Sequence, residues 1–168
     1  MPELLVVRHG KSDWSTGAPD RERPLNMRGR TAAMTMGRAL RLADHAPQLV
    51  MTSPALRAHT TARLAAEVGE WEDVPIEVVE ELYGSGPGAV IEVLRERART
   101  DRLAVVGHEP TWSSLVSILI GGGRIRMPTA AVAAVDVPSW RSVGPGEGTL
   151  MWMLIPRLIT DGFFDLGL

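Results

Sequence analysis

Short apolar runs alternate with amphipathic segments along the chain, a pattern typical of α/β proteins. The first run covers residues 4–7 and is followed directly by charged residues. Such an uninterrupted aliphatic run indicates a strand that is buried on both faces of a parallel sheet. Further strands are expected at residues 49–52, at 75–79, from residue 103 onward, at 131–137 and at 150–155.

Helical periodicity fills most of the intervals between these strands. Apolar side chains recur on one face of residues 28–43, and the same spacing recurs over residues 112–120, where Gly121 ends the helix. Another helix is expected to begin at Pro87. A Gly- and Pro-rich turn at residues 138–148 joins the last two strands as a hairpin. The expected fold is therefore a three-layer α/β/α sandwich with a mostly parallel, mixed central sheet.

One helix start carries a recognisable capping pattern. Ser53 directly follows the second strand and is expected to be the N-cap, with Pro54 at the first helical position. The helix then contains Arg57 about one turn from its start and ends near Gly69. This arrangement places a guanidinium group close to the carboxyl end of the sheet.

The composition excludes several classes of function. The 168 residues suit a single domain spanning residues 1–168, and a net charge of −2 gives no basic footprint for nucleic acid or a membrane surface. Without cysteine the chain has no thiolate chemistry, and its four histidines lack the spacing of a zinc site, so no metal and no cofactor are expected. The apolar run before Arg8 is too short for a signal peptide, and a cytoplasmic monomer is the default expectation.

Charged side chains follow the ends of three expected strands. Arg8 and His9 follow the first strand, Arg57 follows the second, and His108 follows the strand that begins at Leu103. Ligands of such sheets bind beyond the carboxyl ends of the strands, so these side chains are expected to share one pocket. Taken singly, each arginine could be a solvated surface charge, and His108 could be a buried histidine with satisfied hydrogen bonds.

The motifs around these residues resemble a known family. The run RHG at residues 8–10, the pattern SPxxRAxxT at 53–61 and the run GHxP at 107–110 resemble the histidine phosphatase (phosphoglycerate mutase-like) superfamily. The short chain, the run RHGKSDW at residues 8–14 and the pattern RPLxxRG at 23–29 resemble its SixA-like phosphohistidine phosphatase branch. The likeness extends over most of the chain.

Phosphoryl transfer gives these residues distinct expected roles. A neutral imidazole is a competent nucleophile, and His9 is expected to form a covalent phosphohistidine intermediate without a metal. Arg8, Arg57 and His108 would stabilise the negative charge on the transferring group. The resemblance places a general acid near Glu81, with a solvated surface carboxylate as the alternative.

Other residues near the expected pocket are candidate substrate contacts. Lys11, Ser12 and Arg21 are assigned this role. The alternatives are a rim charge for Lys11 and a self-compensating charged loop at residues 20–23 for Arg21. Glu109 either raises the pKa of His108 or faces solvent.

Departures from the mutase pattern favour hydrolysis over phosphoryl exchange. Ser15 replaces the asparagine of mutase members, and no long insertion that could form a lid follows Tyr83. The expected activity is dephosphorylation of phosphohistidine on a protein. The alternatives are hydrolysis of a small phosphorylated metabolite and, from another class, a noncatalytic phosphate-binding module. Such a module would not need His9.

Overall fold

Six strands form the central sheet of the computed structural model, which describes residues 1–71 and 73–161. In chain order they are β1 (Glu3–Arg8), β2 (Leu49–Thr52), β3 (Ile76–Val78), β4 (Arg102–Gly107), β5 (Val132–Asp136) and β6 (Thr149–Leu154). Their order in the sheet is β3-β2-β4-β1-β5-β6. The first four strands are parallel, whereas β5 is antiparallel to both β1 and β6. The predicted mixed sheet and its terminal hairpin are confirmed.

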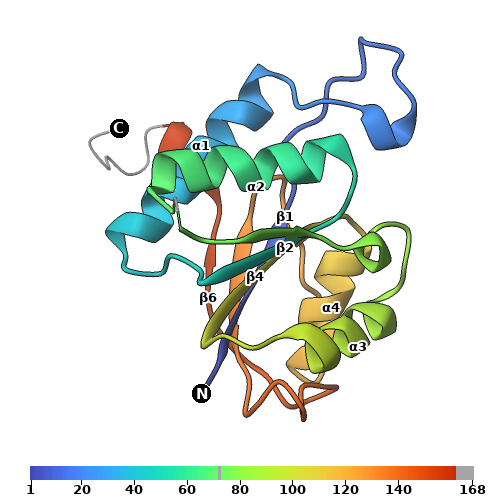
Figure 1. Ribbon diagram of the computed structural model, residues 1–168, viewed down its shortest axis with the longest axis vertical. Coiled ribbons are helices and arrows are strands. Elements are labelled where there is room, and N and C mark those ends of the chain that lie inside the picture. The colour runs from blue at the N-terminus through green and yellow to red at the C-terminus, as the bar shows by residue number, and fades with distance from the viewer. Residues whose placement is uncertain (72, 162–168) are drawn as a thin grey trace.

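Helices cover both faces of this sheet. They are α1 (Met27–Leu42), α2 (Leu56–Gly69), α3 (Pro87–Arg97), α4 (Thr111–Leu119) and the short α5 (Pro156–Thr160). Figure 1 shows α1 and α2 on one side of the strands and α3 and α4 on the other. Successive side chains of β1 enter opposite cores, Leu5 packing on the α1 and α2 side and Leu4 on the α3 and α4 side. The predicted three-layer sandwich is confirmed.

Glycines allow the start of α1 to pack against the segment that follows β1. A Cβ atom on Gly10 would lie 2.6 Å from the carbonyl oxygen of Gly29, and one on Gly29 would lie 2.2 Å from that of Lys11. Asn26 caps the helix by accepting the Gly29 N–H at 2.9 Å. This close approach brings the first turn of α1 next to the residues that follow His9.

Two short 3₁₀ helices, η1 (Asp20–Glu22) and η2 (Glu80–Leu82), lie in the loops after β1 and β3. None of the helices in the described ranges is long and apolar enough to cross a membrane. The expected single domain over residues 1–168 extends beyond the described residues and stays a prediction.

Candidate active site

The sheet register brings the two histidines of the motifs together. Arg8 pairs with Gly107 across the parallel strands β1 and β4, so His9 and His108 leave the sheet side by side. Their ring centroids are 5.0 Å apart. Strand β2 lies on the other side of β4 and leads into α2, which carries Arg57. The structure thus gathers all four residues that were predicted to share a pocket.

Hydrogen bonding fixes the tautomer of His9. Its Nδ1 atom lies 2.6 Å from the carbonyl oxygen of Gly10, and the ring is buried. Because a carbonyl oxygen can only accept, the neutral ring carries its proton on Nδ1. The lone pair therefore lies on Nε2, which is the nitrogen that can attack phosphorus.

Burial and neighbouring cations keep both rings neutral. Burial, with the charges of His108, Arg57 and Arg8, lowers the pKa of His9 to about 3, although the Gly10 hydrogen bond acts in the opposite direction. Burial, followed by the charges of Arg57 and Arg8, lowers the pKa of His108 to about 4. A nucleophilic His9 needs no deprotonation near neutral pH.

These lowered pKa values predict that both rings stay neutral at about pH 5. An NMR titration should place the protonation midpoints near about 3 for His9 and about 4 for His108. The unfolded chain binds these protons near pH 6.5, so the free energy of unfolding should decrease as the pH falls from 6.5 toward about 3. Midpoints near 6.5 in the folded protein would contradict the described burial.

Ser53 orients His108 and does not cap a helix. Its Oγ lies 2.7 Å from Nε2 of His108 and accepts the Ala55 N–H at 3.2 Å. The prediction that Ser53 is the N-cap is wrong, since α2 begins at Leu56 with Ala55 as its cap. If the hydroxyl proton goes to Nε2, the proton of the neutral His108 ring lies on Nδ1. That nitrogen is buried and has no partner among the described residues, so it is available to an oxyanion.

The guanidinium groups of the two arginines have different surroundings. Arg8 donates from Nη1 to the carbonyl oxygen of Met127 at 2.8 Å, while its buried Nε has no partner in the described part of the chain. Arg57 donates to Asp20 twice, from Nη1 to the backbone oxygen at 2.5 Å and from Nη2 to the carboxylate at 3.1 Å. Asp20 therefore holds η1 against the start of α2.

Asp20 is a site residue that the sequence did not reveal. Besides Arg57, its carboxylate accepts from the Tyr83 hydroxyl at 2.7 Å and from Arg23 at 2.9 Å. The Tyr83 ring in turn packs edge-on against His108, with centroids 5.7 Å apart. Asp20 and Arg23 pair within the loop at residues 20–23, whereas Arg21 pairs with Glu80 outside it, and the loop also reaches the candidate active site.

The three predicted substrate contacts, Lys11, Ser12 and Arg21, have different surroundings. Lys11 is exposed at the edge of a cavity, and buried Ser12 forms an isolated β-bridge with Leu25. Arg21 pairs with Glu80 at 2.7 Å, and its guanidinium lies 5.7 Å from the centroid of the Tyr83 ring.

The structure does not bring Glu81 into contact with either histidine. Its carboxylate pairs with Arg97 of α3 at 2.8 Å, and half of the side chain is exposed. Glu109 was expected either to raise the pKa of His108 or to face solvent. Its carboxylate instead accepts from the backbone N–H and the hydroxyl of Ser113 in the first turn of α4.

The described residues contain no group of three or more histidine, cysteine, aspartate or glutamate side chains arranged to hold a metal ion. The cations that act on both histidines are the guanidinium groups of Arg57 and Arg8, and the carboxylate of Asp20 also acts on His108. Guanidinium groups match the oxygens of phosphate in charge and geometry.

Comparison with known proteins extends the resemblance seen in the motifs. The family model "Histidine phosphatase superfamily (branch 1)" matches residues 4–84. An uncharacterised protein of Mycobacterium tuberculosis is 38% identical over 163 residues, which cover 90% of this chain and 100% of that protein. Phosphohistidine phosphatase SixA of Escherichia coli is 28% identical over 160 residues, covering 92% and 94%. A solved structure of the protein histidine phosphatase SixA complexed with tungstate matches with a TM-score of 0.79 and 27% identity, covering 92% of this chain and 97% of that chain.

Motifs, fold and relatives agree. The family model covers the RHG and SPxxRAxxT motifs, and the alignments with relatives span nearly the whole chain. The structural match includes the sheet whose strand ends gather the two histidines and two arginines. The chain belongs to the histidine phosphatase superfamily, and it is a phosphatase.

Proposed function

We propose that the protein hydrolyses its substrate through a covalent phosphohistidine intermediate on His9. The observation that carries this proposal is the free Nε2 of a neutral His9 ring, next to His108 and to the charges of Arg57 and Arg8. Nε2 forms a bond to phosphorus while the leaving group departs with the electron pair of its own bond. Water then attacks phosphorus, which releases inorganic phosphate and restores the His9 lone pair.

Preorganised positive charge supplies most of the expected rate enhancement. Arg8 and Arg57 each present a fixed guanidinium group, and Nδ1 of His108 offers a further donor for a phosphoryl oxygen. Charge on the three equatorial oxygens develops beside the buried side chains of His9 and Arg57, where such contacts are stronger than in bulk water. Each group keeps its position through a contact with the surrounding protein.

Phosphohistidine on a protein is the first substrate candidate. The full-length likeness to phosphohistidine phosphatase SixA supports this assignment. Imidazole leaves readily once it is protonated, so the reaction makes a modest demand on a general acid. The position of Glu81, paired with Arg97 and out of contact with the histidines, is compatible with such a substrate. A small phosphomonoester is the second candidate, and a basic cavity beside Arg8 favours it.

The proposal predicts activity against phosphohistidine in the presence of EDTA. The arginines take the part that a divalent cation has in other phosphatases, so chelation should change the rate by less than about twofold. The assay compares a phosphohistidine protein with a set of phosphorylated metabolites, with and without EDTA. Loss of turnover in EDTA and its recovery on adding magnesium would overturn the metal-independent mechanism.

The role of Glu81 is expected to depend on the leaving group. If Glu81 is the general acid, Glu81→Gln should slow hydrolysis of an alkyl phosphate by about 10²-fold and that of an aryl phosphate with an acidic phenol much less. Glu80→Gln is the matched control, because the neighbouring Glu80 carboxylate pairs with Arg21. Equal losses on both substrates would assign Glu81 a structural role, and no loss on either would make it a solvated surface residue.

A further inference from the structure

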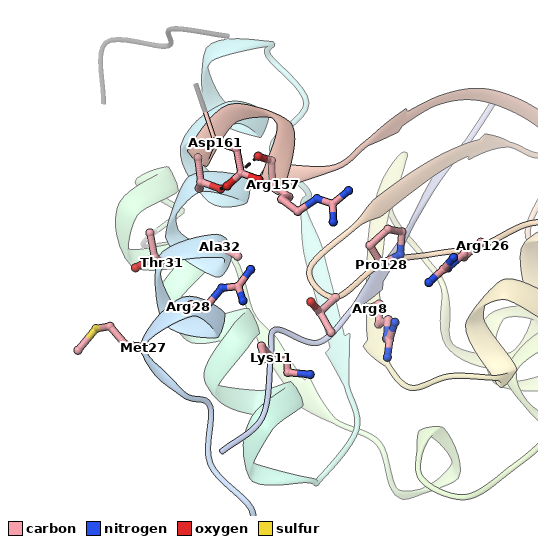
Figure 2. A pocket seen from close by; sticks show the side chains of 12 residues that line it. Arg8, Lys11, Met27, Arg28, Thr31, Ala32, Arg126, Pro128, Arg157 and Asp161 are labelled. Carbon is pink, nitrogen blue, oxygen red and sulfur yellow. Dashed lines mark hydrogen bonds between the residues drawn. The ribbon is translucent and has the colours of Figure 1, made fainter. Parts of the chain in front are cut away.

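A cavity of about 580 Å³ opens beside the candidate active site. Four segments line it: the end of β1 with the residues that follow, the start of α1, the loop between α4 and β5, and α5 with the residue after it (Figure 2). Its volume falls within the range of about 300–1,000 Å³ that is typical of small-molecule sites. Its lining contains Arg8 of the centre described above, but none of His9, His108 and Arg57.

The cavity concentrates positive charge in a chain whose net charge is −2. Its cationic lining residues are Arg8, Lys11, Arg28, Arg126 and Arg157, against a single carboxylate, that of Asp161. In Figure 2 the side chains of Arg28 and Arg157 extend toward the side that carries Arg8 and Arg126. Within residues 1–71 and 73–161, no carboxylate lies within ion-pair distance of any of these cations. An anion would relieve this uncompensated charge.

Arg8 belongs to both the cavity and the candidate active site. Its charge lowers the pKa of His9 and of His108. Burial lowers the pKa of Arg8 itself, the charge of Glu109 raises it, and the charge of Arg126 lowers it. The Nε of Arg8 is buried without a partner among the described residues. A buried donor of this kind normally has an acceptor, and an anion between the two sites would supply one.

We propose that this cavity binds a second phosphate or diphosphate group of a small-molecule substrate whose other phosphoryl group is transferred to His9. The lining includes the threonines Thr31 and Thr129, whose hydroxyls can donate to phosphate oxygens. Planar guanidinium groups bind such oxygens in pairs. The assignment rests on the proposed covalent function, and it favours the small-molecule substrate over the phosphoprotein.

A binding experiment tests the cavity without any turnover. The double variant Arg28→Gln, Arg157→Gln keeps every residue of the histidine centre. Calorimetry with inorganic diphosphate should show an affinity lower than that of the unmodified protein by about tenfold or more, since each lost charge-assisted contact weakens binding by about that factor. The matched control is Arg63→Gln, an exposed arginine of α2 whose nearest carboxylate partner is Glu67 at 4.0 Å. Its affinity should stay within about twofold.

A kinetic experiment then tests whether the bound group belongs to the substrate. The kcat/KM of a diol bisphosphate is compared with that of the matching diol monophosphate. The unmodified protein should prefer the bisphosphate by about tenfold or more, and the double variant should lose most of this preference. The Arg63→Gln control should keep it.

The outcomes separate this proposal from the covalent mechanism. Unchanged diphosphate affinity in the double variant would overturn the anion site, whatever the catalytic mechanism. Weakened affinity without a bisphosphate preference would overturn the assignment to a substrate group. Tighter binding of an aspartate-rich peptide than of diphosphate would overturn the small-molecule class. If diphosphate binding behaves as expected but no phosphohistidine forms, the covalent proposal fails and the anion site stands.

Discussion

Replacing His9 with alanine is expected to abolish turnover, with kcat falling by about 10⁴-fold or more. Alanine removes the nucleophile, so the remaining charges can stabilise only direct attack by water. A loss of this size is usual when a covalent nucleophile is deleted. The Gly10 carbonyl oxygen holds the proton of His9 on Nδ1 and so leaves the lone pair on Nε2. Alanine cannot replace that lone pair. The measurement is steady-state hydrolysis of an aryl phosphate and of a phosphohistidine protein.

Two controls separate lost chemistry from lost structure. His45→Gln changes a histidine that pairs with Glu3 at the opposite end of β1, and it should retain activity within about twofold. The His9→Ala protein should still bind tungstate, since Arg8, Arg57 and His108 remain. Activity of His9→Ala within about tenfold of the unmodified protein would argue against a covalent intermediate on this residue.

Replacing Arg57 with alanine is expected to lower kcat/KM by about 10²- to 10³-fold, the usual loss for one preorganised charge-stabilising donor. Arg57 is buried, and its charge contributes to the lowered pKa of both histidines. Its removal also frees Asp20, which then loses its anchor on α2. Both consequences are expected to lower kcat/KM.

Conservative substitution distinguishes charge from geometry at this position. Arg57→Lys keeps one positive charge but cannot reproduce the planar fork that contacts both the backbone and the carboxylate of Asp20. It should recover part of the lost kcat/KM, whereas Arg63→Ala on the exposed face of α2 should have little effect. If Arg57→Ala is as active as the unmodified protein, Arg57 has no catalytic role.

The strands of the sheet could be predicted because short stretches of sequence indicate each of them. Residues 4–7 and 103–106 form uninterrupted apolar runs, and their burial on both faces follows from that pattern alone. The glycine-rich turn at 138–148 likewise indicated the hairpin of β5 and β6. Once these strands are adjacent, motif residues at their carboxyl ends must meet, which is why the four candidate residues could be grouped from sequence.

Long-range contacts explain what the sequence did not reveal. Ser53 has the local signature of an N-cap, but its hydroxyl lies 2.7 Å from His108, 55 residues away. Asp20 looks like one charge in a mixed loop, and nothing local indicates that it reaches Arg57 in another helix. The basic cavity is similar, since its arginines come from four separate parts of the chain. Periodicity specifies elements, whereas contacts of this kind depend on how the elements pack.

The surroundings of the expected general acid also depend on long-range contacts. The family resemblance implied a general acid near Glu81, whereas the carboxylates of Glu80 and Glu81 both pair with arginines. Glu80 pairs with Arg21 from η1, and Glu81 pairs with Arg97 at the end of α3. These partners are 59 and 16 residues away, so only the folded structure shows which carboxylate faces which element.

Trapping the phosphoenzyme tests the covalent mechanism most directly. The protein is mixed with an aryl phosphate, quenched rapidly in base to preserve phosphohistidine, digested, and mapped by mass spectrometry. The account predicts one phosphoryl group on the peptide that contains His9, formed and lost at rates that match turnover, and absent from His9→Ala. A phosphoryl group on His108, or burst kinetics without any phosphorylated histidine, would contradict it.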